Sequence, residues 1–135
     1  FLHPQPVVMA CSGHSLAAGA LLLLTGDYRI GLNGDFKIGL NETAIGMTMP
    51  HFGIEIARER LGSQALTQAI LNAQLYNPQE AAAIGYLDQS ADENKLNDLV
   101  QEKLQALSSL DGNAFAATKK GIRHTTAQLI RDNLK

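Results

Sequence analysis

The sequence has few of the residues that stabilise small proteins through disulfides or metals. Its single cysteine, Cys11, cannot form an internal disulfide, and no group of cysteines and histidines has the spacing of a metal site. We therefore expect no metal. The lone thiol fits a reducing cytosol or organelle matrix, and we predict a cytoplasmic protein.

Long hydrophobic runs and clusters of like charge are also missing. The longest apolar run, residues 16–24, is far shorter than the roughly 20 residues of a membrane-spanning helix. With 13 acidic and 11 basic residues the net charge is −2, and no basic stretch could follow a phosphate backbone. These absences argue against a membrane and against nucleic acid as partners.

The composition that remains suffices for one compact domain, since 45% of the 135 residues are hydrophobic. The chain begins with Phe1 rather than methionine, close to an apolar run, so we expect a further segment upstream. Residues 7–10 predict a buried strand, and residues 17–24 predict a helix that is apolar on all sides. Residues 28–32 and 36–40 predict two strands joined by the Asn33-Gly34 turn, which is typical of a hairpin.

The pattern beyond Pro50 is helical. Apolar residues at helical spacing predict a helix through Leu61 and a second one over residues 64–73, and Asn77-Pro78 predicts the start of a third that Gly85 ends. Residues 86–87 predict a short extended piece. Two apolar stripes follow, one at residues 96, 99, 100, 104, 107 and 110 and one at residues 115, 122 and 129. This order predicts a mixed α/β layer extended by a helical tail.

Three ordered segments between Pro6 and Pro50 resemble the crotonase (enoyl-CoA hydratase/isomerase) superfamily. PVVMACSGHSLAAG at residues 6–19 resembles a crotonase strand that ends in a Gly-rich turn and opens a buried helix. DYRI at 27–30 is similar to the Asp-x-Arg-Ile that follows this helix, and IGLNET at 38–43 is similar to a segment of mitochondrial enoyl-CoA isomerases. The resemblance covers essentially the whole chain, but only the later part of a full family member.

This resemblance implies an α/β fold in two parts. Residues 1–91 form the end of a crotonase-like layered ββα spiral whose N-terminal half is missing, and residues 92–135 form a helical oligomerisation region. Resembling proteins form trimers or pairs of trimers through this region, so a homotrimer or a dimer of trimers is expected. The implied substrate is an acyl-CoA. No separate cofactor is expected, because the substrate itself carries coenzyme A.

Glu42 is the only carboxylate that matches a catalytic position of the family. A place between a strand and the apolar residues Ala44 and Ile45 would hold it in a partly desolvated pocket, where it can take and return a proton near neutral pH. By spacing alone, Glu42 would more often be a glutamate in a surface turn.

The resemblance implies that the backbone N–H of Ala18 is one of two donors that stabilise the enolate oxygen of a thioester. The second donor in the family comes from an earlier loop that this sequence does not contain. The family often has glycine where this chain has Ala17 and Ala18. Alanine leaves the N–H free, but the geometry of the turn becomes a question for the structure.

Leu21 distinguishes the two commonest activities. In resembling hydratases this position is a second glutamate that helps to add water across the double bond, whereas the isomerase-like pattern has an apolar residue. One acid/base can move one proton between two carbons, but it is poorly equipped to activate water as well. We therefore interpret the chain as part of an isomerase that converts 3-enoyl-CoA to 2-enoyl-CoA in fatty-acid metabolism. The plainer alternative is that Leu21 only fills the core.

Further candidates carry less specific signals. His14 follows the turn glycine and is a candidate for substrate contact, although such a histidine is more often bonded to the backbone. His51 and Phe52 are candidates for the wall of the acyl pocket, or they simply pack. Cys11 has no plausible base partner and is interpreted as an inert buried thiol.

Three cations in the last helix, Lys119, Lys120 and Arg123, are candidates for the phosphates of coenzyme A across a subunit boundary. A solvated helix face explains them equally well.

Two rival interpretations remain open. The first is another crotonase-type enzyme, a hydratase or thioesterase, whose second catalytic group lies upstream. The second is a non-catalytic member that binds acyl-CoA or a protein partner. A solvent-facing Glu42, or the lack of a cavity beside the Ala18 amide, would favour the second.

Overall fold

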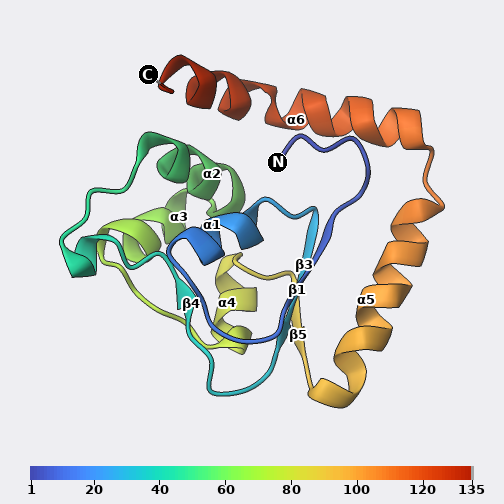
Figure 1. Cartoon of the computed structure of the whole chain (residues 1–135), viewed down its shortest axis with the longest axis horizontal. Coiled ribbons are helices and arrows are strands. Elements are labelled where there is room, and N and C mark those ends of the chain that lie inside the picture. The colour runs from blue at the N-terminus through green and yellow to red at the C-terminus, as the bar shows by residue number, and fades with distance from the viewer. Residues whose placement is uncertain (135) are drawn as a thin grey trace.

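The computed structural model describes residues 1–134 as a layer of short strands and helices with a helical tail (Figure 1). This arrangement confirms the predicted α/β class. The elements in chain order are β1 (Val8–Cys11), β2 (Ser15–Leu16), α1 (Ala18–Leu24), β3 (Tyr28–Leu32), β4 (Ile38–Gly39), the 3₁₀ helix η1 (Thr43–Ile45), α2 (His51–Leu61), α3 (Ser63–Leu66), the π-helix η2 (Thr67–Leu71), α4 (Pro78–Ile84), β5 (Gln89–Ala91), α5 (Glu93–Ser108) and α6 (Gly112–Asp132).

The strands form two small parallel sheets. One has the order β1-β3-β5, with Val8 opposite Tyr28 and Ile30 opposite Gln89. The other pairs β2 with β4. Because parallel strands run in one direction, the segments that follow β2 and β4 begin at the same edge of their sheet.

The predicted hairpin at Asn33-Gly34 is wrong. β4 does not return along β3 but pairs in parallel with β2, and Ile38 also forms an antiparallel bridge with Tyr76. Gly34 does turn the chain, with φ +155°, yet the turn delivers it to the other sheet. An Asn-Gly turn specifies a local reversal, whereas the partner of the next strand depends on which buried surface is available.

Helix α1 lies at the centre of the main core. Ala20 and Leu24 are fully buried, as the apolar run predicted. Leu22 is 64% exposed, so the helix is not buried on all sides. α1 packs closely on α2 because residue 53 has no side chain. A Cβ at Gly53 would lie 2.7 Å from the sulfur of Met49 and 3.3 Å from Cδ1 of Leu21.

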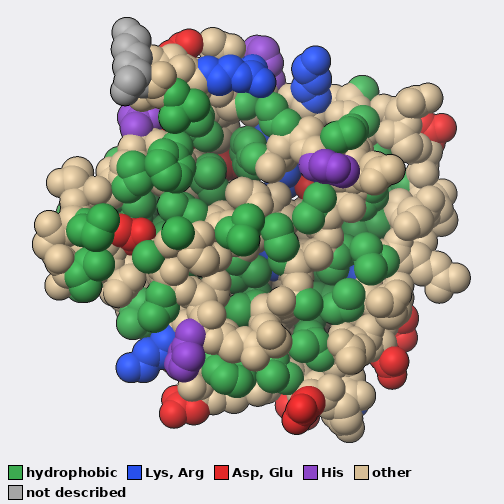
Figure 2. Space-filling view, in the orientation of Figure 1, with side chains coloured by type: hydrophobic (Ala, Val, Ile, Leu, Met, Phe, Trp, Pro, Cys, Tyr) green, Lys and Arg blue, Asp and Glu red, His purple; other side chains and the backbone are tan. Residues whose placement is uncertain are grey.

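The helical tail packs against the outside of this core. Leu96 of α5 is buried with Ile30 and Ala91, and α6 crosses α2 and the N-terminal segment (Figure 1). Within the described residues, no helix is both long enough and apolar enough to cross a membrane. The face turned to the viewer in Figure 2 carries hydrophobic side chains across its middle.

Lys119 and Arg123 are buried, so a solvated helix face is the wrong interpretation of these two residues. They also line a cavity of about 200 Å³, and their contact with the phosphates of coenzyme A stays a prediction. Both side chains are buried on Asp27, at 2.6 Å and 3.0 Å between nitrogen and oxygen. Lys119 also donates to the carbonyls of His3 and Gln5. Only Lys120 lies on the exposed side of the helix. The sequence predicted that these cations lie on the last helix, but helical spacing carried no information about Asp27, whose carboxylate faces two of them.

Two smaller differences concern element boundaries. The helix predicted over residues 64–73 ends at Leu71 and its second part is π-helical. Tyr86 and Leu87 are buried but not extended strand, which begins only at Gln89. The start of α4 is confirmed, with a capping box in which Asn77 and Glu80 bond each other's backbone amides.

Candidate active site

The parallel pair β2 and β4 brings Ala18 and Glu42 to one edge of the molecule. Leu16 lies opposite Gly39, and the N–H of Ala17 donates to the Gly39 carbonyl at 3.0 Å. Ala18 comes two residues after β2 ends, and Glu42 three residues after β4 ends. The two principal residues predicted from the sequence therefore lie beyond neighbouring strand ends, although 24 positions separate them in the chain.

The turn before α1 leaves an amide exposed. Ala17 has φ 50° and ψ −121°, a left-handed conformation that L-residues rarely adopt. Ala18 is the first residue of α1, it is exposed, and its N–H takes part in no hydrogen bond within residues 1–134. Beyond the C-terminal end of α1, Arg60 donates to the Gly26 carbonyl at 2.9 Å. The free amide of Ala18 is at the N-terminal end of α1, where the helix dipole is positive.

Glu42 is buried, with 5% of its surface exposed. Its carbonyl accepts from the amides of Ile45 and Met47, so the backbone folds tightly around it. The loop that carries Glu42 is also held by Thr43, whose hydroxyl lies 3.1 Å from the carbonyls of Ile70 and Leu71. Oε2 of Glu42 is buried and has no hydrogen-bond partner among the described residues. The alternative of a glutamate in a surface turn does not fit this burial.

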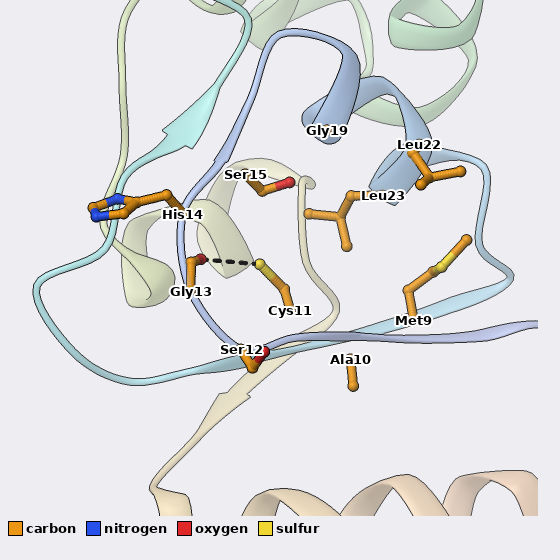
Figure 3. A pocket seen from close by; sticks show the side chains of 10 residues that line it. All are labelled: Met9, Ala10, Cys11, Ser12, Gly13, His14, Ser15, Gly19, Leu22 and Leu23. Atoms are coloured by element: carbon orange, nitrogen blue, oxygen red, sulfur yellow. Dashed lines mark hydrogen bonds between the residues drawn. The ribbon is translucent and has the colours of Figure 1, made fainter.

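A cavity of about 340 Å³ lies between β1 and the start of α1. Its lining includes Gly19, the neighbour of Ala18, and the side chains of Met9, Cys11, Ser15 and Leu23 point into it (Figure 3). Cys11 donates to the Gly13 carbonyl, and burial raises the pKa of its thiol. The thiol is therefore protonated at neutral pH and fits the predicted inert role.

A second cavity, of about 300 Å³, lies beside η1. It is lined mainly by apolar side chains, among them Met49, Ile54, Leu66 and Ile70, and it includes Thr43, the residue after Glu42. Met49 also packs near Leu21 across the approach of α1 to α2. Leu21 is thus buried behind the wall of this cavity, and no second carboxylate stands in its place.

The other predicted contact residues lie less centrally. His14 lines the first cavity but turns away from its centre in Figure 3, because its Nδ1 accepts from the Lys37 amide at 3.0 Å. His51 and Phe52 are exposed on the first turn of α2, where the His51 ring lies 3.7 Å from Glu55. Neither lines one of the two cavities. Their proposed role in binding stays a prediction.

Sequence reasoning missed two tyrosines in the core. Tyr76 and Tyr86 are buried with their ring centroids 5.8 Å apart, and neither hydroxyl has a hydrogen-bond partner among residues 1–134. Their sequence positions, in a loop and after a helix-ending glycine, carry no signal that would have singled them out.

Comparisons with known proteins agree on one family. A family model described as enoyl-CoA hydratase/isomerase matches residues 2–134. The chain is 31% identical over 125 residues to the human mitochondrial enoyl-CoA delta isomerase 1, covering 92% of this chain and 41% of that protein. It is 28% identical to the peroxisomal enoyl-CoA delta isomerase 2 of Arabidopsis thaliana, covering 88% of this chain and 52% of that protein. The chain thus spans about half the length of these curated relatives.

Solved structures are similar over nearly the whole chain. An enoyl-CoA hydratase/isomerase family protein from Pseudomonas syringae has a TM-score of 0.95 at 41% identity, over 98% of this chain and 57% of that one. A Mycobacterium tuberculosis protein has a TM-score of 0.92 at 37% identity, over 98% of this chain and 58% of that one, and is described as an enoyl-CoA isomerase. Another structure of this same M. tuberculosis protein, with the same identity and TM-score, is described as a probable enoyl-CoA hydratase.

Proposed function

Because this chain belongs to the enoyl-CoA hydratase/isomerase family, we propose that the protein of which it forms part is an isomerase that converts 3-enoyl-CoA to 2-enoyl-CoA. One observation carries the proposal: a buried carboxylate, Glu42, and an unbonded amide, that of Ala18, lie beyond the ends of the same strand pair. Moving a double bond next to a thioester needs one base and one donor to the enolate oxygen.

In the proposed reaction the thioester oxygen accepts a hydrogen bond from the Ala18 amide. Glu42 removes a proton from the α carbon, and the electron pair of that bond moves toward the carbonyl to form an enolate. The same carboxyl then delivers the proton to the γ carbon, the double bond shifts into conjugation, and Glu42 is a carboxylate again. One well-placed oxyanion donor typically supplies about 3 kcal/mol of transition-state stabilisation. A second donor, as the family resemblance implies, would come from the part of the protein outside this chain.

Leu21 supports isomerisation over hydration. Its side chain is buried between α1 and α2, so no carboxylate at this position can activate water. The hydratase remains the second candidate, because the matching family model includes both activities and the same M. tuberculosis protein is described in both ways. A non-catalytic acyl-CoA-binding role is not favoured, since Glu42 is buried and a cavity adjoins the Ala18 turn.

Glu42→Gln in the complete protein tests the base. The amide keeps the shape of the side chain but cannot accept the α proton, so kcat for isomerisation falls at least about 100-fold while KM changes little. Glu55→Gln is the matched control, because Glu55 is another buried carboxylate but lies on α2, 3.7 Å from His51 and 3.9 Å from Arg58. Equal rates in wild type and Glu42→Gln would remove Glu42 from the chemistry.

The same assay with a 2-enoyl-CoA and water separates isomerase from hydratase. We expect isomerisation to exceed hydration in the wild type, and Leu21→Glu to add weak hydration if the buried helix accepts the charge. Hydration that outpaces isomerisation in the wild type would favour the second candidate.

A further inference from the structure

The loop that carries Glu42 has little packing to hold it. Glu42 and Met49 are buried, but residues 43–48 between them are all exposed. We call residues 42–48 the Glu42 loop; it includes η1 and lies at the left edge of the molecule in Figure 1, in teal. Packing against the core therefore fixes the two ends of this segment and not its middle, although the proposed base stands at one of these ends.

The backbone hydrogen bonds of the Glu42 loop are local. The amides of Ile45 and Met47 donate to the Glu42 carbonyl, and the Gly46 amide donates to the Thr43 carbonyl. These bonds give the turn its shape. They join close neighbours in the sequence, so they do not fix the turn relative to the helices beside it.

One side chain connects the Glu42 loop to a distant element. The Thr43 hydroxyl donates to the carbonyls of Ile70 and Leu71 in η2, each at 3.1 Å. Within residues 1–134, these are the only hydrogen bonds that join the Glu42 loop to another helix or strand. The position of the loop against η2 therefore depends on a single hydroxyl.

The two acceptors are available because they lie at the end of the π-helix. A helix leaves its last carbonyls without a donor from its own backbone. The next amides to bond back, those of Asn72 and Gln74, reach carbonyls nearer the start of η2 and pass over Ile70 and Leu71. A hydroxyl placed between the two carbonyls supplies the missing donor, which gives a physical reason for threonine at position 43.

The Glu42 carboxylate depends on this anchor. Its Oε2 is buried and has no hydrogen-bond partner among the described residues, so the backbone of the loop sets where the carboxylate lies. We propose that Thr43 is a positioning residue, whose hydroxyl holds the Glu42 loop on η2 and so keeps the carboxylate where it meets the substrate. Such control matters, because a misplacement of about 1 Å can lower a rate about 100-fold. The anchor stands on the geometry, whereas its effect on the rate rests on the proposed function.

Thr43→Val in the complete protein removes the hydroxyl and keeps the branched shape of the side chain. We expect kcat for isomerisation to fall about 10-fold with KM within about twofold, because the base is misplaced while substrate binding is unchanged. Thr43→Ser keeps the hydroxyl and is expected to retain kcat within about twofold of wild type. The opposite order, an active valine variant and an impaired serine variant, would show that the methyl group matters and would overturn the proposal.

Thr48→Val is the matched control. Thr48 is exposed on the same loop and lines the same cavity beside η1 as Thr43. The hydroxyl bonds to η2 come from Thr43 and not from Thr48, so we expect wild-type kcat and KM for this variant. Equal losses in Thr43→Val and Thr48→Val would mean that any change in the loop impairs the enzyme, which contradicts a specific role of Thr43.

Hydrogen–deuterium exchange tests the anchor without any assay of activity. We expect the amides of Ile45 and Met47 to exchange about 10-fold faster in Thr43→Val than in wild type or Thr43→Ser, because opening of the loop no longer breaks the bonds to η2. Amides of α5 serve as the reference and are expected to be unchanged. Unchanged exchange at Ile45 and Met47, or equal acceleration throughout the chain, overturns the anchor. If the wild type lacks isomerase activity, the proposed function fails, and the exchange rates still decide the anchor.

Discussion

At the scale of single residues, Ala17 carries backbone strain next to the candidate oxyanion donor. Its φ of 50° suits glycine, and for an L-residue such a conformation typically costs about 1–3 kcal/mol. The chain tolerates it because the Ala17 amide is bonded to Gly39 and the following helix is packed in the core. The strain directs the chain so that the Ala18 amide is left unbonded.

Ala17→Gly is expected to stabilise the protein by about 1 kcal/mol, because relief of strain exceeds the extra entropy of glycine in the unfolded chain. Urea unfolding of the complete protein measures the change. Ala117→Gly, at an exposed helical position of α6, is the control and is expected to lose about 1 kcal/mol. A loss of similar size at both positions would show that Ala17 is not strained.

At the scale of elements, α6 is held by buried ion pairs rather than by an apolar seam alone. Asp27 follows α1, accepts the Val7 amide, and binds Lys119 and Arg123 of α6. The same contacts bring the N-terminal segment, α1 and α6 together. A buried ion pair is weak evidence for net stability, but removal of Lys119 leaves buried oxygens without a donor, while Arg123 still pairs with Asp27.

Lys119→Met is expected to lower the free energy of unfolding by about 3 kcal/mol, since it leaves Asp27 and two backbone carbonyls short of a donor. Lys120→Met removes the same charge from the exposed side of the helix, and we expect a change within about 0.5 kcal/mol. Comparable losses in the two variants, measured by denaturant unfolding, would contradict the role of the Asp27 pairs.

At the scale of the whole molecule, α6 keeps an apolar stripe that its own chain does not cover. Ile122 is 67% and Leu129 is 42% exposed, while Lys119 and Arg123 on another side of the helix are buried. Exposed apolar patches of this kind often mark interfaces. The stripe supports the proposal that the complete protein is a homo-oligomer, and threefold symmetry is what the family resemblance implies.

Ile122→Glu is expected to shift the complete protein toward monomers, because a charge placed in an apolar interface loses its hydration. Light scattering over a range of concentrations measures the mass. Ala117→Glu, at an exposed position on a different side of the same helix, is the control for added charge alone. A wild type that is monomeric at all practical concentrations rules out the oligomer.

The sequence by itself determined the elements whose signals are local. Alternation and apolar runs predicted β1, α1 and β3, helical spacing predicted α2, α5 and α6, and the Asn77 cap predicted the start of α4. The ordered motifs around Glu42 indicated the family before any geometry was known. These inferences succeed because propensity, capping and period depend on residues a few positions apart.

Only the tertiary structure decided which distant segments meet. β4 pairs with β2 instead of β3, Lys119 and Arg123 are buried on Asp27, and Tyr76 lies beside the segment that leads to Glu42. Each of these contacts joins residues far apart in sequence, and its partner is chosen by the shape and charge of a surface that exists only after folding. A period of two or 3.6 residues tells which side of an element is buried, and it does not tell what that side is buried against.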